Sequence, residues 1–194
     1  TTRLVGSEMC IRDRDHDGTG LYNTGFGHGD ALHLTAFDPS SDRLQVWDCH
    51  ENKRDGSDFR DAATGKVIFQ LPAAKDVGRC MAADIDPTNY GVEMWSSASG
   101  GIRNIKGEVV CAAPRGLPMN MAVWWDGDLL REMLDKNIIS KYNWRVETCT
   151  PLVTFEGTAG NNGTKYERLI ATRGNDYMLV YNYTGRPMQI DLSK

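Results

Sequence analysis

Hydrophobic positions along this chain fall into short runs, and polar turn residues bound each run. The runs at 44–47, 67–69, 92–95 and 109–110 are rich in valine, isoleucine, phenylalanine and tryptophan, which favour strands. Asp-Pro, Asp-Gly and Gly-Lys dipeptides stand between the runs and mark turns. The pattern therefore predicts an all-β chain made of short strands.

The runs recur with a fixed spacing. The segment His33–Pro39 and the later Trp47 are matched by Met81–Pro87 and Trp95, and the Asp, Pro and Trp positions lie 48 residues apart. A four-stranded propeller blade occupies roughly 40–50 residues. The repeat therefore predicts successive blades of a β-propeller.

A third unit is expected to begin at Trp124–Asp128, with a turn at Asp126–Gly127. One short helix is expected after this turn, at 129–134. A blade cannot bury both of its faces alone, so each blade stacks on its neighbours. Because about three blades do not close a ring, we expect the chain to be a partial β-propeller.

The first residues differ from the rest. Residues 1–14 lack the apolar h-region of a secretory signal. The stretch Leu4–Asp13 resembles the translated sequencing adapters that contaminate assembled sequences. We therefore expect residues 1–14 to be an artefact, the native part to begin near Asp15, and the true N-terminus with any signal peptide to be missing.

Composition narrows the class of protein. The 194 residues include 40% hydrophobic residues, enough for a core, and carry a formal net charge of −4. This charge gives no basic footprint for nucleic acid, and no apolar run is long enough for a membrane span. Cys49, Cys80, Cys111 and Cys149 contain no CxxC pair, so a zinc knuckle is not expected. Whether these cysteines form disulfides stays open.

The densest candidate chemistry lies in Gly27–His33, where two imidazoles and a carboxylate stand close together. The flanking glycines let the backbone turn tightly. Imidazole and carboxylate ligands at this density predict a cation or a proton-transfer site. The alternative is a strand in which His28 and His33 are ordinary polar positions.

Other acidic residues fall on turns. The segment Asp15–Gly18 begins like an oxygen-rich calcium loop. Carboxylates on the repeat turns either bind metal or cap the turns; they are Asp38, Asp84, Asp86 and Glu93. His50–Glu51 follows the run that contains Trp47, and we expect it to face the same end of the blade as His28 and Asp30.

Nine ordered blocks resemble those of the rhamnogalacturonan lyases of polysaccharide lyase family 11. The resemblance covers residues 15–165. The blocks are Gly27–His33, Phe37–Pro39, His50–Glu51, Lys75–Arg79, Met81–Pro87, Met119–Asn120, Trp124–Glu132, Ile139–Lys141 and Asn161–Lys165.

The resemblance implies an eight-bladed propeller with bound calcium. It also implies cleavage of the rhamnose–galacturonate backbone of rhamnogalacturonan I, a pectin component, by calcium-assisted β-elimination. We expect a secreted or periplasmic, monomeric protein whose partner is this polysaccharide. As a fragment with an open ring, the chain is expected to be inactive alone. Two alternatives stay open: a non-catalytic carbohydrate-binding propeller module, and a purely structural repeat stabilised by calcium.

The resemblance also implies roles for individual residues. His28, Asp30 and Glu51 correspond to ligands of the active-site calcium, and His28 contacts the sugar in the alternative interpretation. Arg79 and Lys165 correspond to the catalytic basic pair. The expected substrate contacts are His28, His50 and Asn162. His33 aligns with Met81 of the next unit and is interpreted as structural.

The lyase pattern stops at Lys165. Residues 166–194 are rich in aromatic and β-branched residues and predict further strands. They resemble the C-terminal collagen-binding-type sandwich of some bacterial glycoside hydrolases. We therefore expect a join between two unrelated sequences near Lys165. The alternative is that residues 166–194 supply a divergent last strand of a blade.

Overall fold

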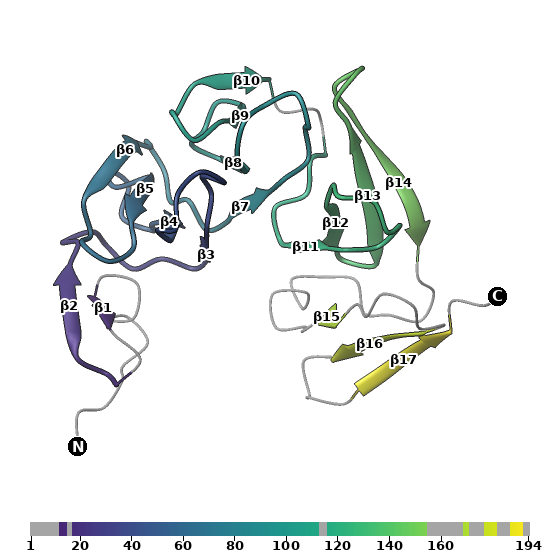
Figure 1. The fold of residues 1–194 in the computed structure, drawn as a ribbon, viewed down its shortest axis with the longest axis horizontal. Helices are drawn as coiled ribbons and strands as arrows, with labels where there is room; N and C mark the ends of the chain where they lie inside the picture. Colours follow the sequence, from purple (N-terminus) through teal and green to yellow (C-terminus); the bar gives the residue numbers. More distant parts are fainter. Residues whose placement is uncertain are drawn as a thin grey trace. The chain divides into compact units, whose positions relative to one another are not determined.

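The structure is a computed structural model that describes residues 12–14, 17–112 and 116–154, together with strands at 169–170, 177–181 and 187–191 (Figure 1). Strands joined by turns and loops make up these ranges, and they contain no helix. Accordingly, no helix capable of crossing a membrane occurs among them. The prediction of an all-β chain is confirmed.

Within the described ranges the strands form five sheets, and each sheet follows the order of the chain. The two-stranded sheet contains β1 (Arg12–Arg14) and β2 (Gly20–Asn23). The first four-stranded sheet contains β3 (Leu32–Thr35), β4 (Gln45–Cys49), β5 (Ser57–Asp61) and β6 (Val67–Leu71). The second contains β7 (Cys80–Ala83), β8 (Glu93–Ser96), β9 (Ile102–Arg103) and β10 (Val109–Cys111). The third contains β11 (Met121–Val123), β12 (Glu132–Asp135), β13 (Ile138–Asn143) and β14 (Thr148–Thr154). The last contains β15 (Leu169–Ile170), β16 (Tyr177–Tyr181) and β17 (Pro187–Asp191).

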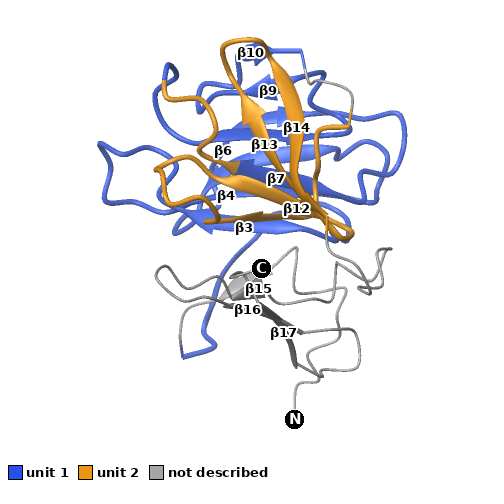
Figure 2. Cartoon of the chain, turned by 90° about the vertical axis from the view of Figure 1, so that its right-hand side faces the viewer, with its two compact units in different colours: residues 1–82, 88–113 blue, residues 83–87, 114–194 orange. Residues whose placement is uncertain are grey.

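The chain divides into two compact units, which Figure 2 colours separately. Residues 1–82 and 88–113 form the first unit, and residues 83–87 and 114–194 form the second. The short segment 83–87 is tied to the rest of the second unit by a backbone hydrogen bond of 2.8 Å, which Arg131 N donates to Asp84 O.

The core of the first unit forms around the central strands of the sheet β3–β6. All of β4 is buried, whereas the residues of the edge strands β3 and β6 are exposed or only partly buried. The antiparallel register aligns Trp47 with Phe59 and Phe59 with Phe69. Phe37 packs edge-on against Phe59 with ring centroids 5.0 Å apart. Large aromatic side chains dominate the burial energy of such a core.

The 48-residue spacing places equivalent residues on equivalent strands. Trp47 lies in β4 and Trp95 in β8, each the second strand of a four-stranded sheet. The indole nitrogen of Trp47 donates to the backbone oxygen of Trp95 at 3.3 Å. Val92 N donates to Phe37 O at 3.0 Å. The repeat therefore contributes directly to the packing of one sheet on the next in the first unit.

The helix expected at 129–134 is wrong. β12 begins at Glu132, and the preceding residues form consecutive bends. Asp128 N donates to Asp126 Oδ1, and Leu130 N donates to Asp128 Oδ1. These side-chain acceptors satisfy the amides that a helix would use, and they stabilise turns instead. The third repeat of the sequence, which was expected to begin at Trp124, also begins earlier than expected, because its first strand, β11, precedes Trp124.

Candidate functional site

Two loops at one end of the sheet β3–β6 carry the clustered histidine and carboxylates. The first loop leads into β3, and the second follows β4. Glu51 N donates to His28 O at 2.6 Å, and Cys49 N donates to Ala31 O at 3.4 Å. These backbone bonds hold the two loops side by side.

The glycine between His28 and Asp30 is required by this close approach. Gly29 is buried, and a Cβ at this position would collide with the backbone oxygen of Cys49. Only glycine lets the first loop run directly against the end of β4. His28 and Asp30 are consequently fixed on either side of a tight contact.

The structure brings His28, Asp30 and Glu51 together, and we name these residues the triad. One potential ligand atom from each residue lies within 4.8 Å of the other two. His28 Nδ1 is 3.4 Å from Glu51 Oε2 and 4.0 Å from Asp30 Oδ1. This nitrogen is buried and makes no hydrogen bond, although about a third or more of each side chain of the triad is exposed. The triad is therefore open to solvent but points a buried nitrogen at two carboxylates.

Arg79, to which the family resemblance assigns a catalytic role, lies beside the triad. Its Nη1 atom is 3.8 Å from Asp30 Oδ2 and donates to the backbone oxygens of Asp30 at 3.3 Å and Gly78 at 2.8 Å. These bonds fix the guanidinium. About a quarter of the Arg79 side chain stays exposed. A guanidinium thus lies next to three side chains that are close enough together to hold a metal ion.

His50 does not reach the surface. Its side chain is completely buried. Nδ1 donates to Gly27 O at 3.0 Å, and Nε2 donates to Asp58 Oδ1 at 2.7 Å. This geometry corrects the prediction that His50 contacts substrate. The ring faces inward, because successive residues of an extended chain point to opposite sides. Its bond to Gly27 O supports the loop that carries His28 and Asp30.

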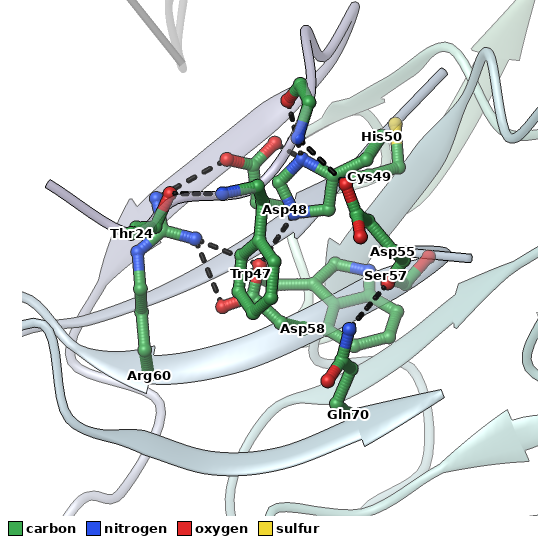
Figure 3. A network of polar contacts seen from close by, with 12 residues as sticks. Thr24, Trp47, Asp48, Cys49, His50, Asp55, Ser57, Asp58, Arg60 and Gln70 are labelled. Atoms are coloured by element: carbon green, nitrogen blue, oxygen red, sulfur yellow. Dashed lines mark hydrogen bonds and ion pairs between the residues drawn. The ribbon is translucent and has the colours of Figure 1, made fainter. Parts of the chain in front are cut away.

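His50 belongs to a buried network of charged residues that also contains Asp48, Asp58 and Arg60 (Figure 3). Arg60 donates from Nη1 to both carboxylate oxygens of Asp58 at 2.9 Å and from Nη2 to Asp48 Oδ2 at 3.1 Å. All four side chains are inaccessible to solvent. With Arg60 and His50 protonated, two positive groups balance two carboxylates. Asp48, His50 and Asp58 also lie close enough to hold a metal, but the guanidinium already occupies their oxygens.

Burial and neighbouring charges shift the pKa values in this network. Burial raises the pKa of Asp48 to about 6, against the opposing effect of Arg60 and His50. Burial lowers the pKa of His50, but its hydrogen bond to Asp58 and the charges of Asp48 and Asp58 outweigh this and raise it overall. Both partners of the His50 ring are acceptors, so both ring nitrogens carry protons.

A third acidic cluster lies in the second unit. Asp126, Asp128 and Glu132 converge, and the ammonium of Lys141 contacts all three carboxylates, with Nζ 2.6 Å from Asp128 Oδ2 and 3.1 Å from Glu132 Oε1. Burial lowers the pKa of Lys141, but these three carboxylates raise it overall. A cation of the chain itself therefore contacts all three carboxylates and balances one of their three negative charges, so we interpret the cluster as a structural ion-pair group.

Some candidate residues have structural contacts, and others lie outside the described residues. Asp38 Oδ1 accepts hydrogen bonds from Ser40 and from the hydroxyl of Tyr90, which identifies it as a turn cap. His33 Nε2 lies 3.2 Å from Cys80 O, in agreement with a structural role. Asn162 and Lys165 lie outside the described residues, as do Asp15 and His16, so their roles stay predictions.

The sequence alone did not reveal the buried network. Asp48, Asp58 and Arg60 stand inside strands next to Trp47 and Phe59. Charged residues that alternate with large apolar residues in a buried strand are the signal that could have revealed it.

Comparison with known proteins gives the family. The sequence profile described as "Rhamnogalacturonan lyase family 11, C-terminal domain" matches residues 5–173, and the chain belongs to this family. The resemblance seen in the sequence is thereby confirmed. A second profile, that of a collagen-binding domain of a collagenase, matches residues 157–194.

Two curated relatives come from Bacillus subtilis (strain 168). The chain is 49% identical over 166 residues to rhamnogalacturonan endolyase YesW, which covers 84% of this chain and 26% of that protein. It is 42% identical over 169 residues to rhamnogalacturonan exolyase YesX, covering 78% of this chain and 27% of that protein. The crystal structure of YesW matches with a TM-score of 0.76 at 39% identity, covering 92% of this chain and 31% of that chain. The chain thus spans about a quarter of the length of these curated relatives.

Proposed function

We propose that this chain is part of a lyase that cleaves the backbone of rhamnogalacturonan I by β-elimination. The observation that carries the proposal is the placement of Arg79 beside the triad on one open surface. Family membership and the names of the relatives support the same activity. A cell-wall polysaccharide is the substrate, so action outside the cytoplasm is part of the proposal.

We further propose that the three four-stranded sheets are blades of a β-propeller. Each contains four strands in chain order, and the first two repeat with a spacing of 48 residues. That period is typical of propeller blades. In this proposal, the rest of the family's eight blades come from parts of the full protein that lie outside this chain.

The residues of the triad fit a calcium ion. Two carboxylates supply the oxygen ligands that calcium prefers, and the buried Nδ1 of His28 is left without a hydrogen bond next to them. Histidine is a less usual calcium ligand, so we assign Asp30 and Glu51 as the principal ligands. When bound, calcium neutralises the uronate carboxylate and makes the neighbouring C5 proton more acidic.

The residues of the chain perform the remaining tasks. Guanidinium groups keep their proton in proteins, so Arg79 binds the uronate carboxylate and stabilises the enolate-like charge that develops on it. Asp30 holds Arg79 in this orientation through its backbone oxygen. A base removes the C5 proton and the C4–O bond then breaks; by resemblance we assign this base to Lys165.

The test transfers this segment into an intact relative. The corresponding part of YesW is replaced by residues 17–173, and the release of unsaturated uronate from rhamnogalacturonan I is followed by ultraviolet absorbance. We expect the chimera to cleave and its Arg79→Ala form to lose about 10²–10³-fold in rate. Lys53→Ala is the matched control, because it also removes a positive charge, and Lys53 is exposed and stands two residues after Glu51 in the sequence.

Two results would contradict the proposal. One is a folded chimera that binds the polysaccharide without releasing product, which fits a non-catalytic carbohydrate-binding module. The other is an Arg79→Ala chimera as active as its parent. Product release that is unchanged by a chelator would remove calcium from the proposal while leaving the lyase assignment intact.

A further inference from the structure

Two buried cysteines lie next to residues of the site and contact the same carbonyl oxygen, that of Ala31. Cys49 ends β4 and stands two residues before Glu51, whereas Cys80 begins β7 and directly follows Arg79. Both residues are completely buried in the core of the first unit. Cys49 therefore lies at the end of the strand that leads to Glu51, and Cys80 lies at the start of the strand that follows Arg79.

The contacts place the two sulfurs together. The backbone oxygen of Ala31 lies 3.6 Å from Cys49 Sγ and 3.4 Å from Cys80 Sγ. Cys80 Sγ also lies 4.0 Å from the backbone oxygen of Trp47 in β4, and both cysteines belong to one buried core cluster. A disulfide needs two cysteines whose side chains approach each other closely, and Cys49 and Cys80 are described cysteines whose sulfurs contact the same carbonyl oxygen. Cys111 instead contacts its neighbour Ala112.

We propose that Cys49 and Cys80 are a redox pair that closes into a disulfide linking β4 to β7. The oxidant is an organic disulfide of the glutathione type. One cysteine loses its proton, and its sulfur displaces a glutathione thiolate, which forms a mixed disulfide. The sulfur of the second cysteine, also deprotonated, then displaces the second glutathione thiolate. The protein loses two hydrogens, and one glutathione disulfide becomes two molecules of glutathione.

The cross-link has a structural consequence at the site. It ties the strand that leads to Glu51 to the strand that follows Arg79, so the distance between these two side chains is held by a covalent bond. It also restricts the unfolded chain between the two cysteines. The inference does not depend on the proposed lyase activity, because it concerns the thiols alone.

The experiment uses a full-length variant that keeps only this pair, Cys10→Ser/Cys111→Ser/Cys149→Ser. Because both thiols are buried, the protein is refolded in oxidised glutathione and, separately, in a reductant. Free thiols are then alkylated, and the peptides are mapped by mass spectrometry. We expect a Cys49–Cys80 linked peptide after oxidation and a melting temperature on the order of 5–10 °C above that of the reduced form.

Two outcomes would overturn the proposal: full alkylation of Cys49 and Cys80 after oxidation, or a linked peptide with an unchanged melting temperature. The wild-type chain is mapped in parallel, and preferential pairing of either cysteine with Cys111 or Cys149 would also overturn it. Adding Cys80→Ser to the variant should abolish the rise in melting temperature. If that form does not fold, the peptide map of the parent variant still decides the question.

Discussion

At the scale of single residues, Arg60 is the main compensating charge beneath the triad. It donates to Asp48 and Asp58, and none of the three side chains reaches solvent. Removing one member of such a group leaves buried charges uncompensated, which costs far more than losing an exposed ion pair. The position of the two triad loops therefore depends on a residue that has no contact with substrate.

Replacing Arg60 tests this dependence. We expect Arg60→Met to lower the free energy of unfolding by about 3–5 kcal/mol, because two buried carboxylates lose their partner. Urea denaturation followed by tryptophan fluorescence measures the change. Arg43→Met is the matched control: its ion pair with Asp61 is exposed, so the expected change is within about 0.5 kcal/mol. Equal effects of the two variants would contradict this role for Arg60.

Two glycines near the triad should respond differently to substitution. A Cβ on Gly29 collides with the backbone oxygen of Cys49, whereas a Cβ on Gly78 meets its nearest atoms at 3.9 Å. We expect Gly29→Ala to cost about 1–3 kcal/mol of stability, as overpacking does, and to weaken calcium binding at least tenfold. Gly78→Ala should leave both unchanged. The assays are thermal unfolding and calorimetric titration, and a neutral Gly29→Ala would refute the close approach of the loops.

The predictability of individual residues depended on how local their signal was. The sequence placed His28, Asp30 and Glu51 at one end of a blade because they stand next to recognisable strands and turns, and the structure brings them together. Their role as calcium ligands came from the family resemblance and stays a prediction. His50 was misassigned because its neighbour Glu51 is exposed, while the ring itself points to the opposite side of the chain. Side-chain direction at the end of a strand depends on register, which sequence does not specify locally.

At the scale of elements, the antiparallel pair β4–β5 contains both the aromatic core and the charged network. Trp47 pairs with Phe59, and the adjacent register positions pair Asp48 with Asp58 and Val46 with Arg60. Alternation along the two strands thus separates an apolar face from a charged one. The repeat and the turn dipeptides allowed the strands to be predicted, whereas Asx turns replaced the helix expected before β12.

The charged face of β4–β5 should make stability depend on pH. Burial raises the folded-state pKa of Asp48 to about 6 from the ordinary value of 3.8. The folded state then binds a proton that the unfolded state has lost, so this contribution is complete below about pH 4 and disappears as the pH rises through about 6. The raised pKa of His50 acts in the same direction, at higher pH.

The prediction concerns the difference between the wild type and Asp48→Asn, whose amide does not titrate. The free energy of unfolding of the wild type relative to this variant should fall by about 3 kcal/mol between pH 4 and pH 8. Urea denaturation at several pH values measures it. A difference that is constant, or that rises with pH, would show that the pKa of the Asp48 carboxyl is not raised in the folded protein.

At the scale of the whole molecule, the described residues form a β protein with three consecutive four-stranded sheets, and the chain belongs to the family whose profile is described as the C-terminal domain of rhamnogalacturonan lyase family 11. The repeat and the three four-stranded sheets could be predicted because strand and turn signals recur along the sequence, whereas the sheet β1–β2 was not expected. What this chain provides on its own is one loop pair with a triad, a guanidinium and a buried support.

The most direct test of the account is a calorimetric titration of the chain with calcium chloride. The wild type and Glu51→Gln are compared, with Glu108→Gln as control, because Glu108 is an exposed turn residue of the first unit. We predict that Glu51→Gln weakens calcium binding at least tenfold, since a charged ligand is lost, while Glu108→Gln leaves it unchanged. Identical isotherms for the wild type and Glu51→Gln would contradict the assignment of the triad as a calcium site.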